Sequence, residues 1–338
     1  MAYFRPLAQF GPVRPKAAVS LAGGWAWFDH AEVLSRTGAP EIVPASDIPA
    51  DVLARLTAPR AGIAGLEFDA PRIMGILNTT PDSFSDGGQF DVPAVALAHA
   101  QTMAANGADI IDVGGESTRP GADLIAIDEE IRRTAPVIAA MRAGIKGLST
   151  PISIDTRKAP VAQAAIAAGA NLVNDVSGFT FDTALGPFCA EAGLPVCVMH
   201  AQGDPQTMQK NPHYDDVLLD VYDFLAARVE VLVSLGIARD RIVVDPGIGF
   251  GKTQAHNLTL LAGLSLFHGI GCPVLLGASR KRFIGDISGA AQGPARLPGS
   301  LAVALAGAAQ GAQILRVHDV GETRGALALW HAATMGRV

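Results

Sequence analysis

Several informative kinds of residue are scarce in this 338-residue chain. It has only three cysteines, Cys189, Cys197 and Cys272, and their spacing matches no zinc motif. An odd, scattered set of cysteines is typical of a reducing compartment, so we expect a cytoplasmic protein. No apolar run reaches the roughly 18 residues of a membrane-spanning helix, and we therefore expect no membrane partner.

Blocks of basic residues and aromatic side chains are scarce too. The formal net charge is −6, and aromatic residues make up 6% of the chain. Proteins that bind nucleic acids use basic patches or stacking platforms, so we expect no nucleic-acid partner. Hydrophobic residues make up 49% of the chain and charged residues 17%, which is enough apolar material for a large folded core.

What the chain does have is a repeated short apolar run that ends in polar residues. Most of these runs are separated from the next by a stretch that can form a helix. The eight runs cover residues 72–78, 108–116, 151–156, 172–178, 195–201, 241–247, 273–281 and 312–319. Alternating strands and helices predict an α/β fold with a parallel sheet, and eight such units predict a closed (β/α)8 TIM barrel over residues 71–338.

Residues 1–70 lie outside this repeat, and we expect them to form an N-terminal extension. We predict a hairpin around Gly23-Gly24 and a helix near residues 51–56. The segment WAWF, residues 25–28, would pack either on the outside of the barrel or on its N-terminal end. A TIM barrel carries its active site at the opposite end, so this extension is expected to stabilise the fold and not to catalyse.

Polar side chains gather where the eight runs end, which is where a TIM barrel places its active site. This ring consists of Asn78, Glu116, Asp155, Asn174, His200, Asp245, Lys281, Arg316 and His318. The carboxylates and the amide of Asp155, Asn174 and Asp245 suit a ligand rich in N–H donors, such as a pterin or a guanine-like ring. A carboxylate can accept two parallel N–H bonds from the edge of such a ring.

A group of basic residues lies at the ends of the last two runs and consists of Arg280, Lys281, Arg316 and His318. TIM barrels commonly bind phosphate near strands seven and eight, so this group predicts an anion clamp. The alternative is a solvated basic rim. For His200, a role in the site and a structural role both stay open.

The segment DPGIGFGKT, residues 245–253, looks like a phosphate loop but lacks the required spacing. A Walker A motif has a glycine five residues before the glycine of its Gly-Lys pair, and Pro246 stands at that position. We therefore reject a nucleoside-triphosphate site here. We expect the glycines to let the backbone turn tightly above the barrel, so that Asp245 points into its mouth.

Eight ordered motifs in residues 72–335 resemble those of dihydropteroate synthases. They are NTTPDSFSDGG, GGESTRPG, SIDTRK, NDVSGF, VMHAQGD, DPGIGFGK, GASRKRFIG and LRVHDV. The resemblance implies a transferase that joins 6-hydroxymethyl-7,8-dihydropterin diphosphate to p-aminobenzoate, giving 7,8-dihydropteroate and pyrophosphate in folate biosynthesis. We also expect a homodimer, and competition of sulfonamides with p-aminobenzoate.

The resemblance also implies roles for individual residues. The pterin would be held by Asp155, Asn174, Met199, Asp245 and Lys281. The diphosphate would be held by Asn78, Thr118, Arg316 and His318, with Mg2+ bound near Asn78. The p-aminobenzoate would be enclosed by Phe84, Arg119 and Pro120. The residues expected to act in catalysis are Asp86, Asp155, Asp245, Lys281, Arg316 and His318.

Two alternatives share the pterin pocket. A methyltransferase-type pterin barrel should lack the SRK and RVHD segments together with the NTTPDSFSDGG loop, and this chain has all three. A catalytically silent pterin-binding homologue should have lost loop or diphosphate residues, and none is lost here. The sequence therefore favours the synthase.

Overall fold

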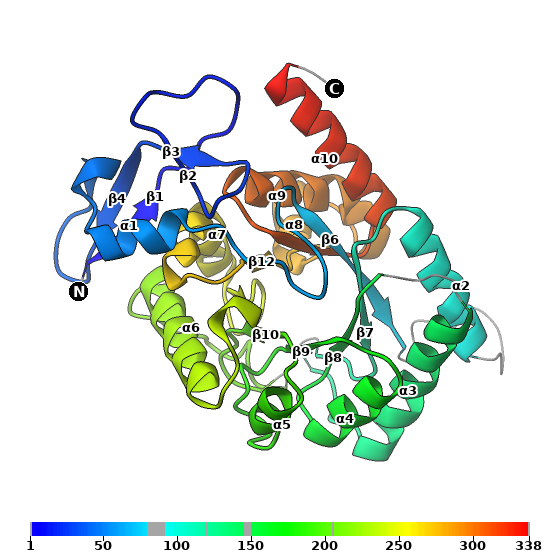
Figure 1. Ribbon diagram of the computed structural model, residues 1–338. Coiled ribbons are helices and arrows are strands. Elements are labelled where there is room, and N and C mark those ends of the chain that lie inside the picture. The colour runs from blue at the N-terminus through cyan, green and yellow to red at the C-terminus, as the bar shows by residue number, and fades with distance from the viewer. Residues whose placement is uncertain (1, 80–91, 119–120, 145–149, 205, 337–338) are drawn as a thin grey trace.

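The computed structural model describes residues 2–79, 92–118, 121–144, 150–204 and 206–336. An eight-stranded parallel sheet forms its centre, and helices surround it (Figure 1). The strands are β6 (Arg72–Asn78), β7 (Ile110–Gly114), β8 (Ile152–Asp155), β9 (Leu172–Asp175), β10 (Val196–Met199), β11 (Ile242–Asp245), β12 (Leu275–Leu276) and β13 (Ile314–Val317). Each falls within one of the eight predicted runs.

The sheet is nearly closed into a barrel. Its strand order is β11-β10-β9-β8-β7-β6-β13-β12, and the named pairs are all parallel. The remaining seam, between β11 and β12, is joined by a parallel bridge between Val244 and Val274. The predicted (β/α)8 barrel is thus confirmed, with the shortest strand at the seam.

Most helices follow the strands as the crossover rule for parallel sheets requires. They are α2 (Val92–Ala105), α3 (Ile127–Gly144), α4 (Ala159–Ala167), α5 (Leu185–Glu191), α6 (Val217–Ser234), α7 (Gln254–Ala262), α8 (Arg282–Ser288), α9 (Leu297–Ala309) and α10 (Val320–Met335). Helix α6 shows how the sequence sets these bounds. The Asp216 carboxylate caps its first turn by accepting from the backbone N–H groups of Leu218 and Leu219, and Gly236 follows its end with a φ of 106°.

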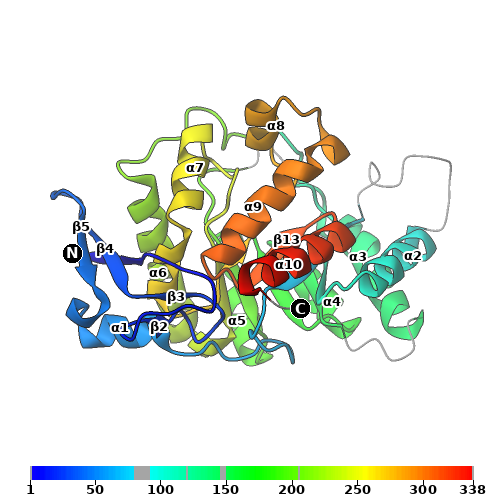
Figure 2. The same ribbon diagram turned by 90° about the horizontal axis from the view of Figure 1, so that it is seen from above.

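Residues 2–57 form a small structure of their own beside the barrel (Figures 1 and 2). Strands β1 (Tyr3–Pro6), β4 (His30–Leu34) and β5 (Glu41–Pro44) make an antiparallel sheet. Strands β2 (Val19–Ser20) and β3 (Trp27–Phe28) make a second, two-stranded sheet, and helix α1 spans Ala50–Thr57. A separate apolar cluster, which includes Phe28 and Leu56, fills this part.

Specific contacts hold this N-terminal part against the barrel helices. The Tyr3 hydroxyl donates to the Asp223 carboxylate of α6 at 2.9 Å, and the Trp25 indole N–H donates to the Ala308 carbonyl of α9 at 2.7 Å. The Phe10 ring stacks on Trp330 of α10 with centroids 4.2 Å apart. These contacts tie the N-terminal part to α6 and to the last two helices, α9 and α10.

The segment between α1 and β6 reaches the N-terminal end of the barrel. Ile63 and Phe68 pack in one buried cluster with residues from the first halves of the strands, among them Met74 and Leu275. Apolar side chains therefore close the end of the barrel that a TIM barrel does not use for catalysis. Treating residues 1–70 as a purely structural extension stays a proposal. Among the described residues, no helix is long and apolar enough to cross a membrane.

We expect Trp27→Ala to lower stability without altering catalysis. The Trp27 side chain is 7% exposed, and removing a buried tryptophan costs about 3–5 kcal/mol. The melting temperature should fall by several degrees. The Michaelis constants for the two expected substrates, the pterin diphosphate and p-aminobenzoate, should change less than about twofold. Val13→Ala is the matched control, because Val13 is 86% exposed. A large rise in either Michaelis constant with stability preserved would place this part over the active site.

Candidate active site

A partly buried cation, Arg316, lies at the carboxyl ends of the strands, in the mouth of the barrel. Arg316 on β13 donates from Nε to the Asp112 carboxylate at 2.6 Å and from a terminal nitrogen to the Asp155 carboxylate at 2.7 Å. Asp112 comes from β7 and Asp155 ends β8, so one side chain connects three strands. The carboxylates oppose the cost of burying the guanidinium.

Asn174 extends this network to a fourth strand. Its amide nitrogen donates to Asp112 Oδ2 at 3.1 Å, while Asp112 Oδ1 has no hydrogen-bond partner among the described residues. Asp112 was not among the predicted site residues. The signal for it was present, because Asp112 is a carboxylate inside an otherwise apolar run, two residues before the strand ends at Gly114.

The last carboxylate of the mouth, Asp245, ends β11 and is held by a tight turn. Its Oδ1 accepts from the Gly247 backbone N–H at 2.7 Å. Gly277 lies next to this carboxylate, since a Cβ atom there would be 3.5 Å from Asp245 Oδ2. Burial raises the pKa of the Asp245 carboxyl, and the Gly247 bond and the charge of Lys281 oppose that rise.

Lys281 lies between this turn and the other basic groups. Its Nζ stands 4.1 Å from the centroid of the Phe250 ring, a cation–π contact. Nearby, Ser279 Oγ is 3.1 Å from His318 Nδ1 and also accepts from the His318 backbone N–H at 3.2 Å. Lys281, Arg316 and His318 thus lie on or just after β12 and β13, the last two strands, where the sequence predicts an anion clamp.

The comparisons with known proteins agree with this arrangement. The family model for pterin binding enzymes matches residues 74–318. A dihydropteroate synthase of Neisseria meningitidis serogroup C is 46% identical over 276 residues, which are 81% of this chain and 96% of the relative. That of Escherichia coli is 47% identical over 259 residues, 76% of this chain and 90% of the relative.

The chain belongs to the dihydropteroate synthase family of pterin binding enzymes. As a member, it is a transferase of folate biosynthesis. Solved structures agree. The Xanthomonas albilineans dihydropteroate synthase with 4-aminobenzoic acid has a TM-score of 0.75 at 45% identity, covering 79% of this chain and 94% of that one. The Yersinia pestis enzyme with a sulfonamide drug has a TM-score of 0.74 at 45% identity, covering 79% and 96%.

Several residues expected from the dihydropteroate synthase motifs have defined positions. Asn78 ends β6, and the strand pairing places it on one side of Gly114 with Asp155 on the other. A Cβ atom on Gly114 would lie 3.8 Å from Asn78 Oδ1 and 3.6 Å from Asp155 Cβ. Met199 ends β10 and is buried. Phe84, Asp86, Arg119 and Pro120 lie outside the described residues.

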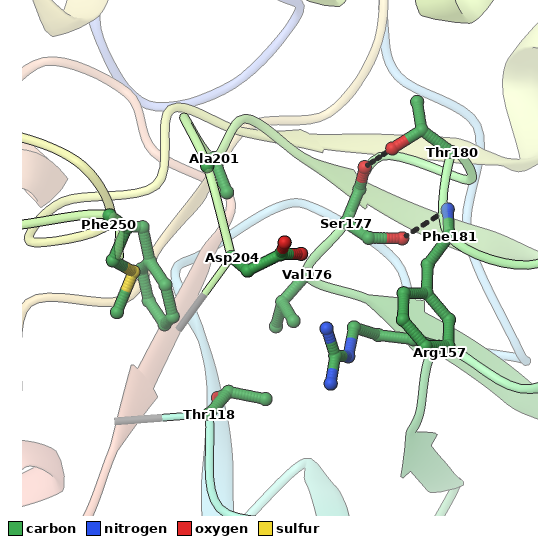
Figure 3. Close-up of a pocket in the computed structure, with 11 residues that line it drawn as sticks. Thr118, Arg157, Val176, Ser177, Thr180, Phe181, Ala201, Asp204 and Phe250 are labelled. Carbon is green, nitrogen blue, oxygen red and sulfur yellow. Dashed lines mark hydrogen bonds between the residues drawn. The ribbon is translucent and has the colours of Figure 1, made fainter. Parts of the chain in front are cut away.

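A pocket of about 490 Å³ lies among the loops that follow strands β7 to β11 (Figure 3). Its lining includes Thr118, Arg157, Ser177, Phe181, Asp204 and Phe250. The side chains of Arg157 and Asp204 point toward its centre, and the Arg157 guanidinium lies 4.3 Å from the centroid of the Phe181 ring. Because Phe250 also contacts Lys281, this pocket adjoins the predicted pterin site.

Glu116 of the expected ring and Arg280 of the expected basic group make other contacts. Glu116 forms a buried ion pair with Arg157 and another with Lys158 at 2.6 Å. Burial opposes ionisation of Glu116, but Lys158 and Arg157 outweigh it and lower its pKa. Arg280 pairs with Asp319. Glu116 therefore helps to fix the β7–α3 loop, and Arg280 is held by the β13–α10 turn.

His200 is buried beneath the site. Its Nδ1 lies 2.8 Å from the Lys252 ammonium nitrogen, and its ring meets Phe224 edge to face with centroids 4.8 Å apart. Burial and, to a smaller extent, the neighbouring Lys252 lower the pKa of His200 to about 2, so the ring is neutral. These contacts support the structural alternative for His200.

Asp155 should make pterin binding depend on pH. Burial raises its pKa to about 7, with Arg316 opposing and Asp112 adding to the rise. Only the ionised carboxylate accepts two N–H bonds, so affinity should fall as pH drops through about 7, approaching tenfold per pH unit below that value. Calorimetry with a simple pterin between about pH 8 and about pH 6 measures this.

Asp155→Asn is the control for this pH dependence. The fall in pterin affinity with a midpoint near pH 7 should disappear in that variant, because an amide does not titrate. If the same midpoint persists, the step belongs to another group and the assignment to Asp155 is wrong.

Proposed function

We propose that this chain joins 6-hydroxymethyl-7,8-dihydropterin diphosphate to p-aminobenzoate, releasing 7,8-dihydropteroate and pyrophosphate. The observation that carries the proposal is the set of carboxylates Asp112, Asp155 and Asp245 gathered around the cation of Arg316 in one barrel mouth, with Asp112 and Asp245 buried. Carboxylates suit the N–H donors of a pterin, and the neighbouring cations suit a diphosphate. The Xanthomonas albilineans dihydropteroate synthase, 42% identical, has been solved with 7,8-dihydropteroate.

In this proposal the pterin lies among Asp155, Asn174, Asp245 and Lys281, with Met199 packing beside the ring. The shielding of the two carboxylates supports it, since Asp245 is buried and the Asp155 side chain is 11% exposed. A hydrogen bond to a polar group shielded from water discriminates strongly against a ligand that lacks the donor. Arg316 now uses one oxygen of Asp155. The pterin edge would share or take over that carboxylate, and Arg316 would then face the diphosphate.

The diphosphate would be held by Asn78, Thr118, Arg316 and His318. Among the described residues, no group of three or more His, Cys, Asp or Glu side chains could hold a metal ion. That suits Mg2+, which commonly takes few protein ligands and fills its shell with waters and substrate phosphates. The Asn78 side-chain oxygen fits this role, and the ion would offset charge on the departing diphosphate.

The proposed reaction needs no nucleophilic side chain. The C–O bond to the diphosphate breaks with its electron pair leaving on the diphosphate, and Arg316 and His318 stabilise that charge. The carboxylates of Asp155 and Asp245 stabilise the positive charge that develops on the pterin side. The amine of p-aminobenzoate then forms the C–N bond and loses a proton.

Further parts of the proposal concern residues and properties beyond this geometry. Asp86 is proposed to lie near the reacting carbon, and Phe84, Arg119 and Pro120 to enclose p-aminobenzoate. We propose a homodimer in the cytoplasm. Light scattering on the purified protein tests the dimer, which a monomeric mass at micromolar concentration would contradict.

A turnover assay tests the proposed function. Pyrophosphate should be released only when both the pterin diphosphate and p-aminobenzoate are present, and a sulfonamide should compete with p-aminobenzoate. Release that needs only the pterin diphosphate would indicate hydrolysis, and no release in a folded protein would contradict the proposal.

Asp155→Asn and Asp245→Asn should each weaken pterin binding by about one to two decades. A hydrogen bond involving a charged group contributes roughly 1.5–3 kcal/mol, and each substitution removes the charge. Calorimetry with a simple pterin measures the loss. Asp215→Asn is the matched control, because the Asp215 side chain is 91% exposed. Unchanged pterin affinity in both variants would contradict the pocket assignment.

A further inference from the structure

Lys252 of the DPGIGFGKT segment is buried rather than facing the barrel mouth. It is 3% exposed, and it forms no ion pair with any described residue. Its Nζ lies 2.8 Å from His200 Nδ1, 3.0 Å from the Phe250 carbonyl oxygen and 3.3 Å from the His200 carbonyl oxygen. This amine therefore bonds to the protein itself, to the His200 ring and to two backbone carbonyl groups.

The turn over residues 246–252 lies directly on the chain that follows β10. A Cβ atom on Gly247 would fall 1.9 Å from the His200 carbonyl oxygen, and one on Gly251 would fall 2.4 Å from the Gln202 carbonyl oxygen. Both glycines have positive φ, 68° and 63°. The 246–252 turn and the chain after β10 are thus in backbone contact, and the Lys252 amine bonds to His200 of that chain.

This turn positions two parts of the proposed pterin pocket. The His200 backbone N–H donates to the Asp245 carbonyl at 3.0 Å, and the Gly247 backbone N–H donates to the Asp245 carboxylate at 2.7 Å. On the other side of the turn, a Cβ atom on Gly249 would lie 3.2 Å from Lys281 Cδ, and the Phe250 ring contacts Lys281 Nζ. The conformation of the turn therefore determines where Asp245 and Phe250 point.

We propose that Lys252 is a positioning residue for the transferase reaction, which acts by fixing the 246–252 turn so that Asp245 and Phe250 face the pterin. The inference rests on the proposed function, because Lys252 can position Asp245 for the pterin only if this site binds a pterin. The surroundings agree with an internal role. Burial lowers the pKa of Lys252 to about 7, with Lys281 adding to the decrease and Asp245 opposing it. The neutral His200 ring accepts a hydrogen bond from it.

Lys252→Met tests this role, because methionine keeps a long buried chain and removes the donors. We expect the affinity for a simple pterin to fall about tenfold or more, since a displaced Asp245 loses a charge-assisted hydrogen bond to the ring. Affinity for pyrophosphate should change less than about twofold, because Arg316 and His318 lie on β13 and just after it. Calorimetry with each ligand measures both, and Lys210→Met, at an exposed position, is the control.

The two binding measurements separate the possible outcomes. A loss confined to the pterin supports positioning, whereas equal losses for both ligands would indicate general destabilisation and overturn the proposal, as would unchanged pterin binding. If Lys252→Met shows no cooperative melting transition, His200→Leu removes the ring acceptor from the other side, and the same selective loss is expected. Full pterin affinity in folded His200→Leu would overturn it. Absent turnover in the parent protein with pterin binding intact would refute the proposed function but leave this test valid.

Discussion

Placing the guanidinium of Arg316 in the mouth of the barrel, where most of it is shielded from water, requires carboxylates around it, and that requirement shapes the rest of the site. An isolated buried charge is costly, so Asp112 and Asp155 must converge from two neighbouring strands. Gly114 and Gly277 lie next to Asp155 and Asp245. The barrel supplies this convergence because parallel strands present their carboxyl ends at one edge.

Three carboxylates around one guanidinium leave the inner mouth negative, while Lys281 and His318 add basic groups near its edge. A ligand with N–H donors at one end and phosphate at the other matches this division of charge. The same division serves a reaction in which positive charge develops on the ring and negative charge on the leaving group. The charges that the barrel brings together, three carboxylates around Arg316, are therefore also the charges that the proposed reaction needs.

The sequence was sufficient for the barrel, because each apolar run with its polar end marks one strand, and β6 matches its predicted range. It also predicted that Asp155, Asn174 and Asp245 lie at the carboxyl ends of strands, which is where β8, β9 and β11 place them, while their roles in binding stay a proposal. It did not identify Asp112, which lies inside a strand where an apolar residue is usual. Contacts between distant segments, such as Lys252 with His200 and Trp25 with α9, depend on tertiary packing that local patterns do not encode.

The central claim is that Arg316 serves the anion and the carboxylates serve the pterin. Comparing calorimetric affinities of Arg316→Ala for pyrophosphate and for a simple pterin tests it most directly. We predict that pyrophosphate affinity falls by about one to two decades and pterin affinity falls much less, because a charge-assisted bond contributes roughly 1.5–3 kcal/mol. In Lys281→Ala both affinities should fall. Equal losses for the two ligands in Arg316→Ala would contradict the account.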